Sequence, residues 1–217
     1  MANISKSVHR FVEQDLALRK DLSRGIVNIR SAAAYIKSQA RLSASIDAVI
    51  SALRRIESGS KDAEPRFSKA ITLIRNAKIT TRNHIAIIAL KKDSSVQEAI
   101  PRLFSLIDYS RGEALRIIQA EELLKVVVDQ RNAAAVSELF TKNKIIHMEK
   151  NLAEVNVHLD PVSSKVPGIL AIFNTELANR GINIVESMTC VPELLWFIDE
   201  TDLLNAHQTF LELMSEE

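Results

Sequence analysis

The chain has 217 residues, of which 47% are hydrophobic and 25% are charged, and this ordinary balance excludes a disordered or fibrous protein. Its single cysteine, Cys190, excludes an internal disulfide and fits a reducing cytoplasm; we expect a buried, inert thiol. No apolar run reaches membrane-spanning length and the N-terminus lacks the apolar core of a signal peptide, so we expect no membrane partner.

The net charge of +1 conceals an uneven distribution of charged residues. Residues 1–82 carry 16 Lys and Arg against 7 Asp and Glu, whereas residues 83–217 carry 12 against 20. A basic segment of this size favours contact with a polyanion. Chance, or attraction between oppositely charged domains, is the alternative interpretation.

Residues 1–60 have the pattern of a small all-helical domain. Apolar residues from Ile4 to Val12 recur at helical spacing, and Gly25 stands where a helix would end. Asn28 and Ser45 are suited to cap two further helices, which reach about Gln39 and Glu57. Two short helices separated by a few residues are typical of a helix-turn-helix.

Residues 61–82 connect this domain to the rest of the chain. The polar segment 58–65 is the strongest linker candidate, and a basic amphipathic helix from about Pro65 to Asn76 follows it. We assign 61–82 to a linker helix and a connecting strand.

From residue 83 the sequence alternates between strand and helix patterns. The first unit, 83–150, has predicted strands at 85–90, 114–120, 123–129 and 145–148 and predicted helices at 101–108 and 133–141. The second unit, 151–217, has a strand that begins at Leu152, strands at 182–190 and 194–199, and helices at 167–179 and 202–214. This second unit has no evident final strand of its own.

The two units form an internal repeat. The matching pairs of segments are Ile100–Phe104 with Val166–Leu170, Arg111-Gly112 with Arg180-Gly181, and Glu122–Asp129 with Glu193–Asp199. Side-by-side pairing of the units would extend one sheet and protect its edges.

Two motifs in the second unit carry a family resemblance: Val166-Pro167-Gly168 before the helix and Arg180-Gly181-Ile182-Asn183 after it. With its β-α-β-β-α order, this unit resembles the ACT domain, a regulatory module that senses amino acids, and the first unit resembles a degenerate copy. The expected fold class is therefore α+β, with an all-helical, helix-turn-helix-like domain followed by two ferredoxin-like βαββαβ (ACT-like) units.

The resemblance implies an effector site in the loop 160–170, because ACT domains receive an amino acid between their first strand and first helix. The ligand-binding residues that it implies are Val166, Gly168, Ile169, Leu170 and Asn183. A helix N-terminus offers free N–H groups to a carboxylate. Arg102 occupies the position matched to Gly168 in the first unit, which argues against a second site. The alternatives are that Pro167-Gly168 only starts the helix, or that the module pairs subunits and binds nothing.

The N-terminal helices resemble, more weakly, a winged-helix or related helix-turn-helix domain, with residues 45–57 as recognition helix. The DNA-binding residues that this implies are Lys37, Arg41, Ser43, Ser45, Arg54, Arg55, Arg66 and Lys69. Small residues and Asp47 at the start of the recognition helix are poorly suited to base readout. A four-helix packing domain without DNA contact is therefore the alternative.

The sequence contains no phosphate-binding glycine loop, no zinc-ligand spacing and no evident catalytic arrangement. We therefore expect no enzyme activity, no metal and no cofactor. The predicted function is a cytoplasmic, amino-acid-responsive transcription regulator that forms a homodimer or higher homo-oligomer. Its expected partners are an amino-acid effector of unknown identity and double-stranded DNA. The alternative is a regulatory subunit that binds no DNA and docks onto an enzyme of amino-acid metabolism.

Overall fold

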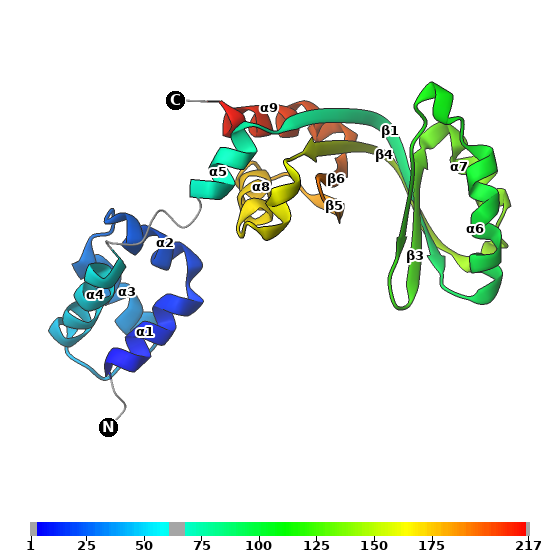
Figure 1. Ribbon diagram of the computed structural model, residues 1–217. Coiled ribbons are helices and arrows are strands. Elements are labelled where there is room, and N and C mark those ends of the chain that lie inside the picture. Colours follow the sequence, from blue (N-terminus) through cyan, green and yellow to red (C-terminus); the bar gives the residue numbers. More distant parts are fainter. Residues whose placement is uncertain (1–3, 61–67, 216–217) are drawn as a thin grey trace. The chain divides into compact units, whose positions relative to one another are not determined.

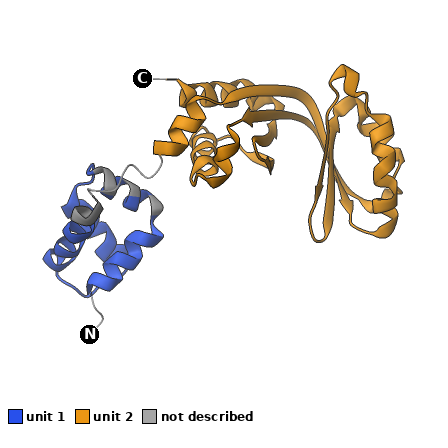
Figure 2. Ribbon diagram, viewed as in Figure 1, with its two compact units in different colours: residues 1–66 blue, residues 67–217 orange. Residues whose placement is uncertain are grey.

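The computed structural model describes residues 4–60 and 68–215, and the chain divides into two compact units, 1–66 and 67–217 (Figure 2). The first unit is helical within its described residues. Its helices are α1 (Ile4–Gln14), α2 (Leu16–Arg24), α3 (Ile29–Gln39) and α4 (Ile46–Ser60) (Figure 1).

Local capping defines these helices. The Asn28 side chain accepts hydrogen bonds from two backbone N–H groups at the start of α3, and Ser45 Oγ accepts one from Ala48 N at 3.2 Å. Gly25 closes α2 at a φ of 70°, a left-handed conformation that glycine adopts without strain. The three predicted helix boundaries are thus confirmed. The helices enclose one core, whose largest members are Val8, Val12, Leu22, Ile36, Val49 and Leu53.

The second unit is built on a six-stranded antiparallel sheet in the order β2-β3-β1-β4-β6-β5. Its strands are β1 (Lys78–Lys91), β2 (Leu115–Gln119), β3 (Leu123–Asp129), β4 (Ile145–His158), β5 (Ile184–Cys190) and β6 (Glu193–Asp199). Its α-helices are α5 (Ser68–Arg75), α6 (Ser94–Leu106), α7 (Ala133–Glu138), α8 (Ile169–Asn179) and α9 (Leu203–Met214). The 3₁₀ turns are η1 (Tyr109–Arg111), η2 (Gln130–Asn132), η3 (Lys142–Lys144), η4 (Pro161–Lys165) and η5 (Glu200–Asp202).

The long strands β1 and β4 each belong to both halves of this sheet (Figure 1). Residues 85–91 of β1 lie between β3 and the start of β4, whereas residues 78–82 pair with the end of β4, which pairs in turn with β6. Each half therefore has four strands in the ferredoxin-like order. The final strand that the second repeat lacks is supplied by residues 78–82, which precede the first repeat in the sequence.

Both long strands bend where the two halves meet. The register between β1 and β4 shifts on either side of Ile85, and the extra residues are His84, with φ 52°, and Asn151, with φ 57°. A residue inserted into a ladder bends its strand, and the left-handed conformation is uncommon outside glycine. Asn151 is held by two hydrogen bonds with the Gln130 side chain in η2, and His84 Nδ1 lies 3.1 Å from Glu200 Oε1 in η5. Each bulge is thus anchored to the turn that follows β3 or β6.

Helices cover the outer faces of the two halves. Helices α6 and α7 pack on one half through a core that contains Ile88, Val126 and Leu103. Helices α5, α8 and α9 pack on the other through a core that contains Trp196, Phe173 and Phe210. A third cluster contains Ile85 and Ile87 of β1, Val127 of β3 and Phe197 of β6, and so joins the opposite faces of the two halves.

Two predictions about the helix α6 are wrong. Helix α6 begins at Ser94, not at Pro101, because Asp93 caps it by accepting a hydrogen bond from Val96 N at 3.0 Å. Pro101 therefore lies inside α6, whereas Pro167 precedes α8, so the match of Ile100–Phe104 with Val166–Leu170 is wrong. The other two matches are confirmed. Gly112 and Gly181 have φ values of 70° and 71° before the second strand of each repeat, and the segments Glu122–Asp129 and Glu193–Asp199 contain the third strands, β3 and β6.

The environment of Cys190 also differs from the prediction. The thiol expected to be buried is exposed, because Cys190 ends the edge strand β5 and pairs with Glu193 across a turn.

Candidate functional site

A pocket of about 350 Å³ lies at the N-terminal end of α8. It is formed by the connection between β4 and α8, the first turn of α8, and the turn that joins β5 to β6. Its lining residues are Leu159, Ser163, Ser164, Val166, Pro167, Gly168, Ile169, Leu170, Ala171, Thr189, Val191 and Leu194.

Hydrogen bonds within the β4–α8 connection fix the wall of the pocket. Leu159 N donates to Pro192 O at 2.9 Å and so fastens the start of the connection to the β5–β6 turn. Asp160 then caps η4 by accepting a hydrogen bond from Val162 N at 2.8 Å, and Val166 N donates to Ser163 O at 3.1 Å. The connection is therefore an ordered turn that leads into α8.

The start of α8 has no side-chain cap. The N-cap residue is Gly168, with a φ of 99°, and it has no side chain that could cap the helix. The first bond of the helix runs from Ile172 N to Gly168 O, so the N–H groups of Ile169, Leu170 and Ala171 have no acceptor inside the helix. Such an end carries a partial positive charge and favours anions.

Ser163 supplies a second unsatisfied group in the wall of the same pocket. The residue is 8% exposed, and its Oγ has no hydrogen-bond partner among the residues that the structure describes. A buried hydroxyl without a partner is costly and uncommon in folded proteins. The neighbouring Ser164 differs, since its Oγ donates to Pro161 O at 3.1 Å.

The structure brings together four of the five predicted ligand-binding residues. Val166, Gly168, Ile169 and Leu170 all line the pocket. Asn183 does not line it; this residue is exposed and lies just before β5. Sequence reasoning did not find the contributions of Ser163, Thr189, Val191 and Leu194. Ser163 lies inside the predicted loop, but Thr189 and Val191 reach the pocket only through the pairing of β5 with β6.

The equivalent helix end in the first half of the sheet is capped by its own carboxylate. Asp93 accepts hydrogen bonds from Val96 N at 3.0 Å and Ser95 Oγ at 2.7 Å, and it also pairs with Lys144 Nζ. These interactions, that with Lys144 foremost, hold the pKa of Asp93 well below its usual range. The N-terminus of α6 is therefore neutralised from within the chain. Capping by Asp93, and not the presence of Arg102, distinguishes the N-terminus of α6 from that of α8.

A buried carboxylate joins the two halves of the sheet. Glu154 on β4 is 2% exposed, with Oε1 3.4 Å from Arg116 Nη2 on β2 and 3.7 Å from Arg82 Nε on β1. Burial raises the pKa of Glu154, and the two guanidinium groups oppose that rise. Its Oε2 has no hydrogen-bond partner within the described part of the chain.

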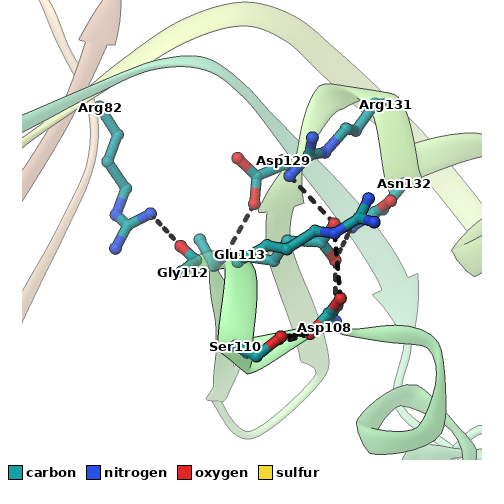
Figure 3. Close-up of polar contacts among 10 residues, drawn as sticks. Arg82, Asp108, Ser110, Gly112, Glu113, Asp129, Arg131 and Asn132 are labelled. Carbon is teal, nitrogen blue, oxygen red and sulfur yellow. Dashed lines mark hydrogen bonds and ion pairs between the residues drawn. The ribbon is translucent and has the colours of Figure 1, made fainter.

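Arg82 extends this connection to the loop before β2 (Figure 3). Its Nη1 donates to Gly112 O, and the adjacent Glu113 accepts hydrogen bonds from Asp108 N at 2.9 Å and Asn132 Nδ2 at 2.7 Å. Both bonds lower the pKa of Glu113, and the bond from Asp108 N has the larger effect. Arg82 lies in the strand segment that completes the second repeat, so its contacts tie that repeat to the first.

The residues predicted to bind DNA lie in both units. Lys37 lies in the last turn of α3, Arg41 and Ser43 are exposed in the connection after it, and Ser45 caps α4, on which Arg54 and Arg55 are exposed. Lys69 is exposed on α5 in the second unit, and Arg66 lies outside the described residues.

The connection between α3 and α4 differs from that of a typical helix-turn-helix. It has six residues, 40–45, whereas the motif usually has a turn of three or four. The Ser45 hydroxyl is engaged in the cap, and Arg55 Nε donates to Ser51 O at 3.2 Å.

Within residues 4–60 and 68–215, no helix is long and apolar enough to cross a membrane. The same residues contain no group of three or more His, Cys, Asp or Glu side chains placed to hold a metal ion.

The bent six-stranded sheet with its covering helices is a fold that solved regulatory subunits of aspartate kinase also have. The regulatory subunit of aspartate kinase from Thermus flavus matches with a TM-score of 0.52 and 16% identity, over 63% of this chain and 97% of that one. The ligand-free regulatory subunit from Thermus thermophilus gives 0.50 and 14%, over 63% and 97%.

A larger enzyme has the same fold in one part. Aspartate kinase from Clostridium acetobutylicum matches with a TM-score of 0.50 and 13% identity over 63% of this chain, which spans 34% of that enzyme's length. At these identities the likeness shows the fold alone. Neither protein-family models nor curated protein sequences match the chain.

Proposed function

We propose that this chain is an amino-acid-responsive regulatory protein of the cytoplasm, without enzyme activity of its own, and that its effector binds in the pocket at the start of α8. The observation that carries the proposal is the pairing of an uncapped helix N-terminus with a buried, unpartnered hydroxyl at Ser163. Both groups suit the carboxylate of an amino acid. The fold is one that regulatory subunits of aspartate kinase share.

The same strands that flank the pocket would transmit its occupancy. Leu159 in the pocket wall directly follows β4, and β4 continues through the bend at Asn151 into the first half of the sheet. An effector that binds one arrangement of the two halves more tightly than another would shift the population toward it. The contacts of Arg82 and Glu154 join the two halves, so such a shift would alter them.

DNA is the first candidate for the output, in a homodimer or higher homo-oligomer. Its support is the basic excess of residues 1–82 and the exposure of Arg41, Arg54 and Arg55 in the helical unit. The second candidate is docking onto an enzyme of amino-acid metabolism. Its support is the kind of protein that shares the fold, regulatory subunits of aspartate kinase, together with the long connection between α3 and α4.

A thermal-shift screen of the full chain with each of the twenty amino acids tests the effector. We expect at least one of them to raise the melting temperature, because a ligand that binds only the folded state stabilises it. If none of the twenty raises it, the sensing role is wrong.

The salt dependence of DNA binding separates the two outputs. If the helical unit holds DNA, affinity falls steeply as salt rises, and Arg54→Ala lowers the slope of log K against log salt by about 1. Glu138→Ala, at an exposed acidic position on α7, serves as the control and leaves the slope unchanged. If no DNA binding is detected at low salt, docking onto an enzyme becomes the favoured output.

A further inference from the structure

We propose that the pocket at the start of α8 selects a small monocarboxylate with an uncharged aliphatic chain. This chemistry is shared by aliphatic amino acids and by the 2-oxo acids of the same carbon skeletons. The inference takes the position of the site from the proposed function and adds the chemistry of the ligand.

The side-chain specificity follows from the lining of the pocket. None of the described residues that line it carries a charge, and eight are apolar: Leu159, Val166, Pro167, Ile169, Leu170, Ala171, Val191 and Leu194. The charged residues of the same loop, Asp160 and Lys165, are exposed and do not line the pocket. A charged ligand side chain held against this lining would lose water without gaining a partner, which is unfavourable. The lining therefore disfavours lysine, arginine, aspartate and glutamate and accepts a hydrocarbon chain.

The carboxylate is the group for which the pocket offers donors. The first N–H groups of α8 have no acceptor inside the helix, and the helix is eleven residues long, so its N-terminus carries the usual partial positive charge. Ser163, more than nine-tenths buried in the pocket wall, adds a hydroxyl whose oxygen has no partner within the described residues. A carboxylate oxygen would accept from the N–H groups of the helix. The Ser163 Oγ is itself buried, so it would have to rotate about χ1 into the pocket to donate as well, and it would then gain its missing partner.

The amino group, in contrast, has no counter-charge in the lining. The polar side chains available to it are the hydroxyls of Ser164 and Thr189, and that of Ser164 already donates to a backbone carbonyl. An amino acid and its 2-oxo acid differ only at this group, so we expect their affinities to agree within about tenfold. A volume of about 350 Å³ lies near the lower end of the roughly 300–1,000 Å³ of small-molecule sites, as a ligand of this size requires.

Titration of the full chain, followed by backbone NMR, tests the selectivity. The probes are leucine, valine, the 2-oxo acid of leucine, isopentylamine, lysine and aspartate. We expect the first three to shift the amide signals of Ile169, Leu170 and Ala171. Isopentylamine, which lacks the carboxylate, and the two charged amino acids should bind at least about a hundredfold more weakly.

Ser163→Ala tests the carboxylate contact. Loss of a hydrogen bond to a charged group should weaken leucine binding about tenfold, while unchanged Trp196 fluorescence would show that the fold is retained. Ser187→Ala, at an exposed serine of β5 outside the pocket lining, is the matched control and should bind leucine as the parent does. Full affinity in Ser163→Ala would overturn the assigned contact.

The outcomes separate this inference from the proposed function. If lysine or aspartate binds more tightly than leucine at the α8 amides, the aliphatic selectivity is wrong, but the proposed amino-acid-sensing role stands. Binding of the 2-oxo acid without any amino acid would support the selectivity and overturn the amino-acid effector. If none of the six probes binds, the inference is wrong. If none of the twenty amino acids raises the melting temperature in the thermal-shift screen, the proposed sensing role is separately wrong.

Discussion

Phe173 on α8 offers a quantitative test of how the second unit is held together. Its side chain is fully buried, with ring centroids 5.1 Å from Trp196 and 4.7 Å from Phe210. Truncation to alanine removes the ring from this three-ring cluster and leaves a cavity between α8, α9 and the sheet. Such substitutions cost about 3–5 kcal/mol, a large share of the roughly 5–15 kcal/mol that stabilises a typical domain.

Trp196 makes this measurement local. It is the only tryptophan of the chain, it lies in the same cluster, and its Nε1 donates to Asn174 Oδ1 on α8 at 2.7 Å. Urea unfolding followed by Trp196 fluorescence therefore reports on the second unit. We expect Phe173→Ala to lower the free energy of unfolding by about 3–5 kcal/mol with little change in slope.

Phe104 provides the matched control. It is also a phenylalanine on a helix of the second unit, α6, but it is 53% exposed. Phe104→Ala should change the free energy of unfolding by less than about 0.5 kcal/mol, as surface substitutions usually do. If both variants lose the same stability, or if Phe173→Ala loses less than about 1 kcal/mol, the reasoning from burial and ring contacts is wrong.

Two further predictions concern Glu154 and the cap of α4. Because the pKa of Glu154 is raised in the folded state, this residue contributes stability at low pH that is lost as the pH rises through its folded pKa. Glu154→Gln should therefore be at least as stable as the parent at pH 7 and lose this advantage on acidification. Urea midpoints at pH 7 and at acidic pH check this, and a variant much less stable than the parent at pH 7 would contradict it. Ser45→Ala should remove about 1 kcal/mol from the start of α4 and speed amide exchange at Ala48, whereas Ser43→Ala, at an exposed serine that does not cap the helix, should leave that exchange unchanged.

The elements that could be predicted from the sequence are those defined by local interactions. The caps at Asn28 and Ser45, the stop at Gly25 and the fully apolar strand 85–90 each depend on residues within a few positions of one another. The sequence predicts the start of α6 wrongly because proline favours the first turn of a helix, whereas the Asp93 cap and the packing of Val96 and Ala99 start this helix seven residues before Pro101.

The pairing of distant segments could not be predicted in the same way. The sequence predicts only a connecting strand at residues 78–82, because their pairing partner, the end of β4, lies more than seventy residues away along the chain. Thr189 and Val191 reach the pocket only after β5 has paired with β6. The loop residues Val166 to Leu170 could be assigned because proline and glycine mark the start of α8 in the sequence itself.

The sharing of β1 and β4 has a consequence for how the second unit unfolds. Neither half can lose β1 or β4 without also withdrawing a strand from the other half, so the sheet should open as one cooperative unit. A ligand bound beside α8 would then protect amides in both halves. Exchange at Val126 on β3, in the opposite half from the pocket, should slow nearly as much as exchange at Trp196 on β6. Slow exchange confined to the half that contains the pocket would indicate that the halves open separately.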